Sequence, residues 1–414
     1  MQVTTPVVAA DAVTALAVSL SACSAPVTTV KTLQATTSPA QSPQASVIAA
    51  IVRKGMATYH LRAVIVRVTK GGKVVTTQAF GPSMTGVRAT PAMHFRNGAI
   101  AFAYVATLLM EYVDEHKVRL NDTINRWVPS LPEARKVTLK MLANQTSGYP
   151  DFETDPAWTA AFNADPFRIF TYQERLGYAF RRPAAFPPGK NWSYSPTNFM
   201  ILGHILSMIG KRPLATLLRR KVLKPMGLTG TTSSGTSSMP NPVLHSFSSE
   251  WEVALHAPSK VTFYQEATYW NTVWGTPAGA NETSNIYDLI KTAVAVGTGK
   301  LLSRSGYHAM TDSKLLGFGH KQRNCAPSCF RQIPAYNSGL GVVKAGSWIL
   351  EDSLLSGWSS AEAYLPARKI AIAVAATFDP AAFNPAGVEP NASDPIFRSI
   401  GAYLAPNDPP PTRK

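Results

Sequence analysis

The chain has 414 residues, of which 45% are hydrophobic and 15% charged, and its formal net charge is +16 with a pI near 9.8. This length and composition are sufficient for one large domain or two smaller ones with a sizeable core. The basic residues are dispersed and no nucleic-acid-binding motif is present, which argues against nucleic acid as a partner. A surface that faces anionic lipid or cell-envelope polymer is one explanation of the charge, and a basic protein with no electrostatic partner is another.

The N-terminus resembles a bacterial lipobox. An apolar stretch, Ala12–Leu20, leads into the sequence LSAC at positions 20–23, in which small residues precede a Cys. We therefore expect residues 1–23 to be a lipoprotein signal peptide and Cys23 to be lipidated, which places the protein on the outer face of the bacterial cell membrane or makes it secreted. A basic segment before the apolar stretch is missing and Asp11 is an unexpected acid, so a disordered N-terminus with a chance Cys is the alternative.

The next segment, residues 24–46, is rich in Ser, Thr, Pro, Ala and Gln, which predicts a disordered tether. A domain is expected over 47–404 and a tail over 405–414. The domain begins with a predicted helix at 47–53 and a β-hairpin, whose strands at 62–69 and 73–80 flank a Lys-Gly-Gly turn.

A long apolar helix follows. From Gly98 to Met110 the chain carries no charge, and a helix that is apolar all round must be buried in a large protein. It is too short to span a bilayer. Charged residues return from Glu111 onward, where the helix should meet water, and a second short helix is predicted at 124–127.

The remaining elements are helical in the middle of the chain and mainly extended towards its end. The predicted helices lie at 138–142, 151–186 (a helical stretch with breaks), 198–209, 214–223, 285–296 and 396–404. The predicted strands lie at 251–255, 261–264, 341–350, 358–365 and 369–377. Strands at both ends with helices between them predict an α+β fold. We expect one antiparallel sheet built from both chain ends plus an all-helical subdomain.

Several stretches together resemble the serine β-lactamase-related family, which includes class C β-lactamases, D-alanyl-D-alanine carboxypeptidases and related esterases. They are Phe-Arg-x-Gly at 95–98, the apolar helix, EYVDEHKVRLND at 111–122, WVPSLP at 127–132 and TSGYPDF at 146–152. The resemblance runs from about 47 to 404, and it implies a β-lactamase/transpeptidase-like fold with no cofactor.

The family's first catalytic motif is absent from this chain. In the family a Ser starts the apolar helix and a Lys follows three residues later, so that the amine lies beside the hydroxyl it activates. The corresponding residues here are Ala99 and Phe102. Neither a nucleophile nor its base is therefore expected at these positions.

The second motif, Tyr-x-Asn, is half retained. Tyr194 matches the Tyr that serves the family as general base or proton relay, although an amphipathic aromatic that packs beside the cleft would look the same. Pro196 replaces the Asn, and it has neither a side-chain amide nor an N–H. Asn198 comes two residues late, and we expect it to cap the following helix.

The third motif, Lys-Thr-Gly or His-x-Gly on a strand, corresponds to Glu351-Asp352-Ser353 when counted back from Gly357. Glu351 thus replaces the family's cation. Its acidic side chain would repel a substrate carboxylate. Because the three motifs converge in the family, Ala99, Phe102, Tyr194 and Glu351 are expected to line one cleft, with Pro196 and Ser353 as further altered positions of the same cleft. Such a cleft suits a neutral or cationic ligand.

No replacement for the lost motifs is evident. No Ser is followed three residues later by Lys, and neither a Gly-x-Ser-x-Gly nor a His-Glu-x-x-His sequence is present. An unrelated Ser-His-Asp triad remains an alternative because its residues need not be close in sequence.

The Cys325-Ala-Pro-Ser-Cys329 stretch predicts a local disulfide in an exported protein. A metal site formed with His320 is the alternative, but it would lack a fourth ligand. We expect no bound metal.

Three functions fit these observations. The first is an exported, lipid-anchored member of the family without acyl-enzyme chemistry, which binds a ligand, a cell-wall fragment or a protein partner. The second is a hydrolase of esterase, carboxypeptidase or β-lactamase type that uses Tyr194 or a Ser from a nearby loop. The third is a structural envelope protein whose cleft is filled.

Overall fold

The computed structural model describes residues 42–233, 235–251, 264–271, 282–312 and 314–412. The lipobox with Cys23, most of the predicted tether and nearly all of the strands predicted at 251–255 and 261–264 lie outside these residues. The described residues belong to a single compact unit.

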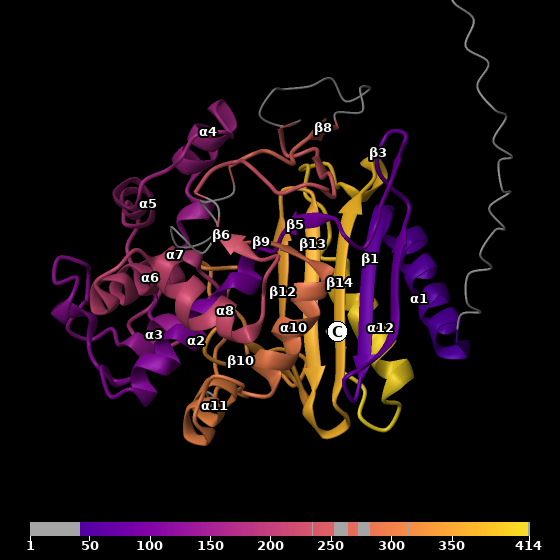
Figure 1. Cartoon of the computed structure of the whole chain (residues 1–414). Helices are drawn as coiled ribbons and strands as arrows, with labels where there is room; N and C mark the ends of the chain where they lie inside the picture. Colours follow the sequence, from indigo (N-terminus) through magenta and orange to yellow (C-terminus); the bar gives the residue numbers. More distant parts are fainter. Residues whose placement is uncertain (1–41, 234, 252–263, 272–281, 313, 413–414) are drawn as a thin grey trace, which may run out of the picture. The chain divides into compact units, whose positions relative to one another are not determined.

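The largest sheet has seven strands in the order β10-β11-β12-β13-β14-β1-β2, and every neighbouring pair is antiparallel. Its strands are β1 Leu61–Lys70, β2 Lys73–Phe80, β10 Asn337–Ser338, β11 Val343–Ala345, β12 Trp348–Leu355, β13 Trp358–Leu365 and β14 Ile370–Phe378. The first hairpin of the chain therefore pairs with the last strand. This arrangement confirms the predicted α+β fold with a sheet built from both chain ends (Figure 1).

Small sheets and ribbons complete the β structure. These are the ribbon β3 Pro82–Met84 with β4 Val87–Arg88, the sheet β5 His94–Arg96, β9 Glu282–Asn285 and β6 Thr232–Ser233, and the ribbon β7 Phe247–Ser248 with β8 Gln265–Glu266.

The helices cover both faces of the large sheet and form a separate group beside it. The α-helices are α1 Pro43–Tyr59, α2 Ala101–Asp114, α3 Leu139–Ala143, α4 Pro156–Ala164, α5 Tyr172–Ala179, α6 Pro196–Gly210, α7 Leu214–Leu218, α8 Lys224–Met226, α10 Ile286–Gly297, α11 Arg304–Thr311 and α12 Ser393–Leu404. Short 3₁₀ turns are η1 Gly98–Ile100, η2 Ile124–Arg126, η3 Phe152–Thr154, η6 Pro366–Arg368 and η7 Pro380–Ala382, and η4 Arg219–Leu223 is a π-helical turn.

Two hydrophobic cores lie on opposite faces of the large sheet. Helices α1 and α12 pack on one face, and α10 packs on the other, where the core continues into α2 and α6 (Figure 1). All residues of β13 and β14 are buried as a result. Among the described helices, none has the length and apolarity that crossing a membrane would require.

Two element boundaries differ from the sequence prediction. Helix α1 begins at Pro43, inside the segment assigned to the tether, because Pro suits the first helical position and the Ser42 hydroxyl accepts the Ala45 N–H at 3.2 Å. The strand predicted at 341–350 is split by a turn at Gly346, and its second half extends to Leu355 as β12. The stretch 351–353 therefore lies within a strand.

The apolar helix is buried as predicted. Residues from Ala101 to Met110 of α2 are at most 2% exposed. Its preceding turn η1 lies against β12, and Gly98 makes this approach feasible: its φ is 49°, and a Cβ there would lie 2.0 Å from the Ser353 Oγ. Only a residue without a side chain fits both demands.

We predict that Gly98→Ala lowers the free energy of unfolding by more than the roughly 1–3 kcal/mol typical of backbone strain alone, because the Ser353 hydroxyl must also move and give up the Ala99 N–H. Gly86→Ala is the matched control, since Gly86 has φ 76° and a Cβ added there would meet no atom within 4 Å. Denaturant unfolding of both variants measures the difference. Equal losses would contradict the close packing of η1 on β12.

Candidate active-site cleft

The first motif position lies at the junction of the helical group and the large sheet. Ala99 is half-buried in η1, and its backbone N–H donates to the Ser353 Oγ at 3.0 Å. The side chain of Ala99 is a methyl group, so this point of the cleft offers no nucleophile. The Ser353 hydroxyl also engages a backbone N–H that would otherwise point into the cleft.

Phe102 takes part in aromatic packing. Its side chain is 1% exposed and stacks on Phe199 of α6, with ring centroids 4.0 Å apart and planes 5° apart. The Tyr194 ring lies 6.3 Å from it at a tilt of 36°. A lysine amine at this position would need a charged partner, whereas the Phe ring is satisfied by its aromatic neighbours.

Tyr194 lies between two cavities. It borders the open cleft together with Ala99 and Ser353, and it borders a small adjoining pocket of about 10 Å³ together with Phe102 and Glu351. Burial raises the pKa of the Tyr194 hydroxyl well above its usual value, and the nearby carboxyls of Glu153 and Asp151 raise it further. The phenol is therefore un-ionised at neutral pH.

The four residues expected to line one cleft fall on two adjoining pockets. Phe102 and Glu351 line the smaller pocket, which shares Trp192, Tyr194 and Tyr336 with the open cleft. Glu351 is 6% exposed. Pro196 is the buried first residue of α6 and borders neither space.

Asn198 does not cap the helix, contrary to the sequence prediction. It is the third residue of α6, and the N-cap residue Ser195 makes no side-chain capping bond. The Asn198 Nδ2 donates to the Gln145 Oε1 at 2.7 Å, and its Oδ1 accepts the Ser147 hydroxyl. Gln145, which the sequence analysis missed, also accepts the Ser195 N–H at 3.1 Å. The sequence marks Gln145 only by its position just after helix α3. In the structure it adopts a left-handed φ of 67° there.

The open cleft has a volume of about 570 Å³, which is within the range of small-molecule sites. Aromatic side chains form much of its wall, namely Trp192, Tyr194, Phe330 and Tyr336. Its two charged lining residues among those the structure describes, Glu153 and Asp352, are both acids. The cleft is thus an aromatic and acidic cavity.

Glu153 is the functional candidate that sequence reasoning did not identify. It lies on η3, and its backbone N–H donates to the Asp151 Oδ1 at 2.9 Å. Its Oε1 is buried and has no hydrogen-bond partner among the described residues. Burial raises the pKa of Glu153 well above its usual value, the Asp151 carboxyl adds to this, and Arg175 opposes it. A donor that entered the cleft could satisfy this oxygen.

A disulfide loop forms one wall of the cleft. Cys325 and Cys329 are joined, with Cα atoms 5.5 Å apart, so their sulfurs are unavailable as thiolate ligands for a metal with His320. No group of three or more His, Cys, Asp or Glu side chains in the described ranges could hold a metal ion. The loop carries Pro327 and Ser328, which both border the cleft.

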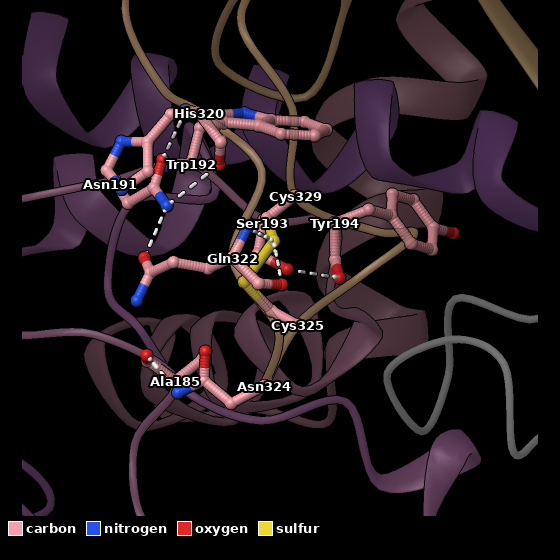
Figure 2. Close-up of a disulfide and its surroundings, with 10 residues drawn as sticks. All are labelled: Ala185, Asn191, Trp192, Ser193, Tyr194, His320, Gln322, Asn324, Cys325 and Cys329. Atoms are coloured by element: carbon pink, nitrogen blue, oxygen red, sulfur yellow. Dashed lines mark hydrogen bonds between the residues drawn. A yellow bond between two sulfur atoms is a disulfide. The ribbon is translucent and has the colours of Figure 1, made fainter.

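Backbone and side-chain hydrogen bonds attach this loop to the segment before α6. The Tyr194 N–H donates to the Ser328 carbonyl at 3.1 Å, and the Asn191 amide bonds to His320 and Gln322. Figure 2 shows the Asn191 bonds beside the disulfide, with the Tyr194 ring directed away from the sulfurs. The disulfide therefore restrains the part of the cleft wall that Pro327 and Ser328 form.

The chain matches the family model described as Beta-lactamase over residues 48–391. It is 24% identical to PbpX of Bacillus subtilis (strain 168) over 165 residues, which are 39% of each protein. It is 23% identical to Protein flp of Staphylococcus aureus (strain COL) over 197 residues, 45% of this chain and 38% of that protein. The matches thus span about two fifths of the length of these curated relatives.

Solved structures show the same fold. The D-amino acid amidase from Ochrobactrum anthropi SV3, complexed with D-phenylalanine, superposes with a TM-score of 0.70 at 21% identity, covering 88% of this chain and 98% of that one. The D-stereospecific amidohydrolase from Streptomyces sp. gives a TM-score of 0.67 at 22% identity, covering 79% and 94%. The expected β-lactamase/transpeptidase-like fold is confirmed.

Two half-buried carboxyls predict a pH-dependent stability. Burial raises the pKa of Asp151 to about 7, and burial together with Glu389 raises that of Glu250 to about 8. A carboxyl whose pKa is raised in the folded state stabilises the fold while it is protonated. Its contribution to the free energy of unfolding is complete below the unfolded-state pKa and is lost as pH rises through the folded-state pKa. The free energy of unfolding should therefore fall as pH rises from about 5 to about 9.

Asp151→Asn should remove part of this slope around pH 7. Asp165→Asn, at an exposed acid, is the matched control and should leave the slope unchanged. Chemical denaturation across the pH range measures both. A slope in Asp151→Asn identical to that of the unsubstituted protein would contradict the assignment.

Proposed function

We propose, for a chain that belongs to the Beta-lactamase family, that the open cleft binds a small neutral or cationic ligand without forming an acyl-enzyme. The observation that carries the proposal is the pair of side chains at the start of α2. Ala99 has no hydroxyl for attack, and the stacked ring of Phe102 has no base to activate one. Without a covalent intermediate, acyl transfer is not divided into two easier steps.

The position of Ser353 also supports a binding role. A developing oxyanion is stabilised by preorganised backbone donors, and the Ala99 N–H is a donor of this kind. In this chain the Ser353 Oγ accepts that N–H at 3.0 Å. A ligand oxygen would have to displace the hydroxyl to use it.

The charge of the cleft supports a cationic ligand. Glu153 and Asp352 line it, and the Glu153 Oε1 is buried without a partner among the described residues. An ammonium group would satisfy this oxygen and favour the ionised carboxylate, whereas a ligand carboxylate would be repelled. The structural neighbour named D-amino acid amidase suggests amino acid amides as probes, which carry an ammonium group and no carboxylate.

A hydrolase that uses a displaced nucleophile is the second candidate. Ser328 and Tyr194 both border the cleft, and this proximity is the observation in its favour. The raised pKa of Tyr194 argues against a phenolate base at neutral pH. A purely structural role with a filled cleft is disfavoured by the open volume of about 570 Å³.

Ligand binding and acylation can be tested on the same protein. We expect D-phenylalanine amide to bind more tightly than N-acetyl-D-phenylalanine amide or D-phenylalanine in calorimetry, and its affinity to rise as pH passes upward through the pKa of Glu153. Glu153→Gln should remove this preference for the amine, and Asp165→Gln is a control outside the cleft. A stronger affinity for D-phenylalanine than for its amide would refute the charge argument.

A fluorescent penicillin should leave no label on the protein after denaturing electrophoresis. The double variant Ala99→Ser with Phe102→Lys should still not turn over substrate efficiently, because Pro196 supplies no amide and Glu351 has the wrong charge. Hydrolysis of a β-lactam or an activated ester above background, abolished by Tyr194→Phe, would replace the binding function with the hydrolase.

We further propose that the protein is exported and attached to the membrane through lipidated Cys23. The lipobox-like sequence LSAC at 20–23 supports this, and so does the Cys325–Cys329 disulfide, since disulfides persist in oxidising compartments. One acyl chain binds membranes only marginally, so two or more chains are expected on Cys23.

Mass spectrometry of the mature N-terminus tests the anchor. We expect a chain that begins at Cys23 and carries acyl groups, and Cys23→Ser should release the protein from membranes. An unmodified Cys23, or an intact segment before it, would count against the anchor.

A further inference from the structure

A second pocket lies among the helices and shares no lining residue with the open cleft. It is formed by α7, the π-helical turn η4, α8 and the segment that leads into β6, and its volume is about 430 Å³. This size fits a small molecule. We call it the π-turn pocket. None of the residues that line it among those described is an acid, and two, Arg219 and Lys224, are cations.

The π-helical turn determines where these two cations lie. The Lys224 backbone N–H donates to the Arg219 carbonyl, which is a hydrogen bond across five residues. In a regular α-helix, residues five apart point in directions about 140° apart around the axis. The wider turn brings them to the same side, and both line the pocket. Such π-bulges are rare and often occur at functional sites.

The two cations have no ion-pair partner among the described residues. Both are exposed, whereas the neighbouring Lys221 is paired with Glu111 and Glu115 of α2. The nearby acid Asp288 is 1% exposed and is already satisfied by the Gly230 N–H at 2.6 Å, the Thr231 hydroxyl and the Lys291 amine. The pocket therefore retains a positive potential.

Hydroxyl groups and the apolar side chains of Ala215, Leu223 and Leu228 make up the rest of the lining. Thr216, Thr229, Thr232 and Ser233 border the pocket beside the two cations. Each hydroxyl can donate one hydrogen bond and accept others, which suits a ligand with both acceptor oxygens and hydroxyls of its own. Arg supplies a fork of donors, and Lys supplies a compact charge. The Arg fork can pair with two oxygens of a phosphate, and a further phosphate oxygen then remains for the Lys.

We propose that the π-turn pocket binds a phosphate group esterified to a small polyol, with Arg219 and Lys224 on the phosphate and the hydroxyl side chains on the polyol. The proposal does not depend on the function of the open cleft. The same chemistry occurs in a soluble phosphate ester and in the headgroup of a phospholipid.

Calorimetry with glycerol phosphate on the full chain tests the site. Arg219→Gln and Lys224→Gln should each weaken binding about tenfold or more, equivalent to about 1.4 kcal/mol. Arg220→Gln is the matched control because Arg220 is exposed, carries the same charge and does not line the pocket. The control should change the affinity by no more than about twofold, as expected for an exposed charge. Glycerol alone should not bind.

Vesicle sedimentation separates the two sources of the phosphate. Binding to phosphatidylglycerol vesicles that is lost in Arg219→Gln and Lys224→Gln but retained in Arg220→Gln would identify a lipid headgroup, with phosphatidylcholine vesicles as the comparison. Binding of glycerol phosphate without vesicle binding would identify a soluble ester. Absence of glycerol phosphate binding, or equal weakening by Arg220→Gln, would overturn the proposal, since the latter result indicates a diffuse surface charge.

Discussion

The contact between turn η1 and strand β12 is the constraint on which the cleft depends. Gly98 approaches Ser353 so closely that no Cβ fits between them, and the next residue, Ala99, donates its N–H to the Ser353 hydroxyl. One side of this contact leads into the buried helix α2, and the other belongs to the seven-stranded sheet. The position of the helical group against the sheet edge, and hence the walls of the cleft, follows from it.

Side chains near the cleft are held by packing and hydrogen bonds with their neighbours. The ring of Phe102 stacks on Phe199, and an aromatic side chain at this position requires no counter-charge. The amide of Asn198 is held by Gln145 and Ser147, within the protein interior. The Phe102 ring and the Asn198 amide are thus both held by neighbouring side chains.

Electrostatics divides the molecule into regions of opposite character. The chain has a net charge of +16, yet the charged side chains that line the open cleft in the described ranges are acids. The π-turn pocket has the reverse character, with two cations and no lining acid in the described segments. A basic protein can therefore present an acidic cavity to one ligand and a basic cavity to another, because each local field is set by the nearest groups.

Local sequence patterns determined much of the fold, and tertiary contacts decided the site. The β-hairpin at 61–80, the buried helix after Gly98 and the late strands were predictable because helix and strand periodicities act over a few residues. The loss of the nucleophile position at Ala99 was also legible in the sequence. That Glu153 would face the cleft, that Gln145 would hold Asn198, and that Glu351 would lie with Phe102 beneath Tyr194 depended on loops meeting across long sequence separations. Such meetings depend on how the helical group packs against the sheet, which no short-range pattern encodes.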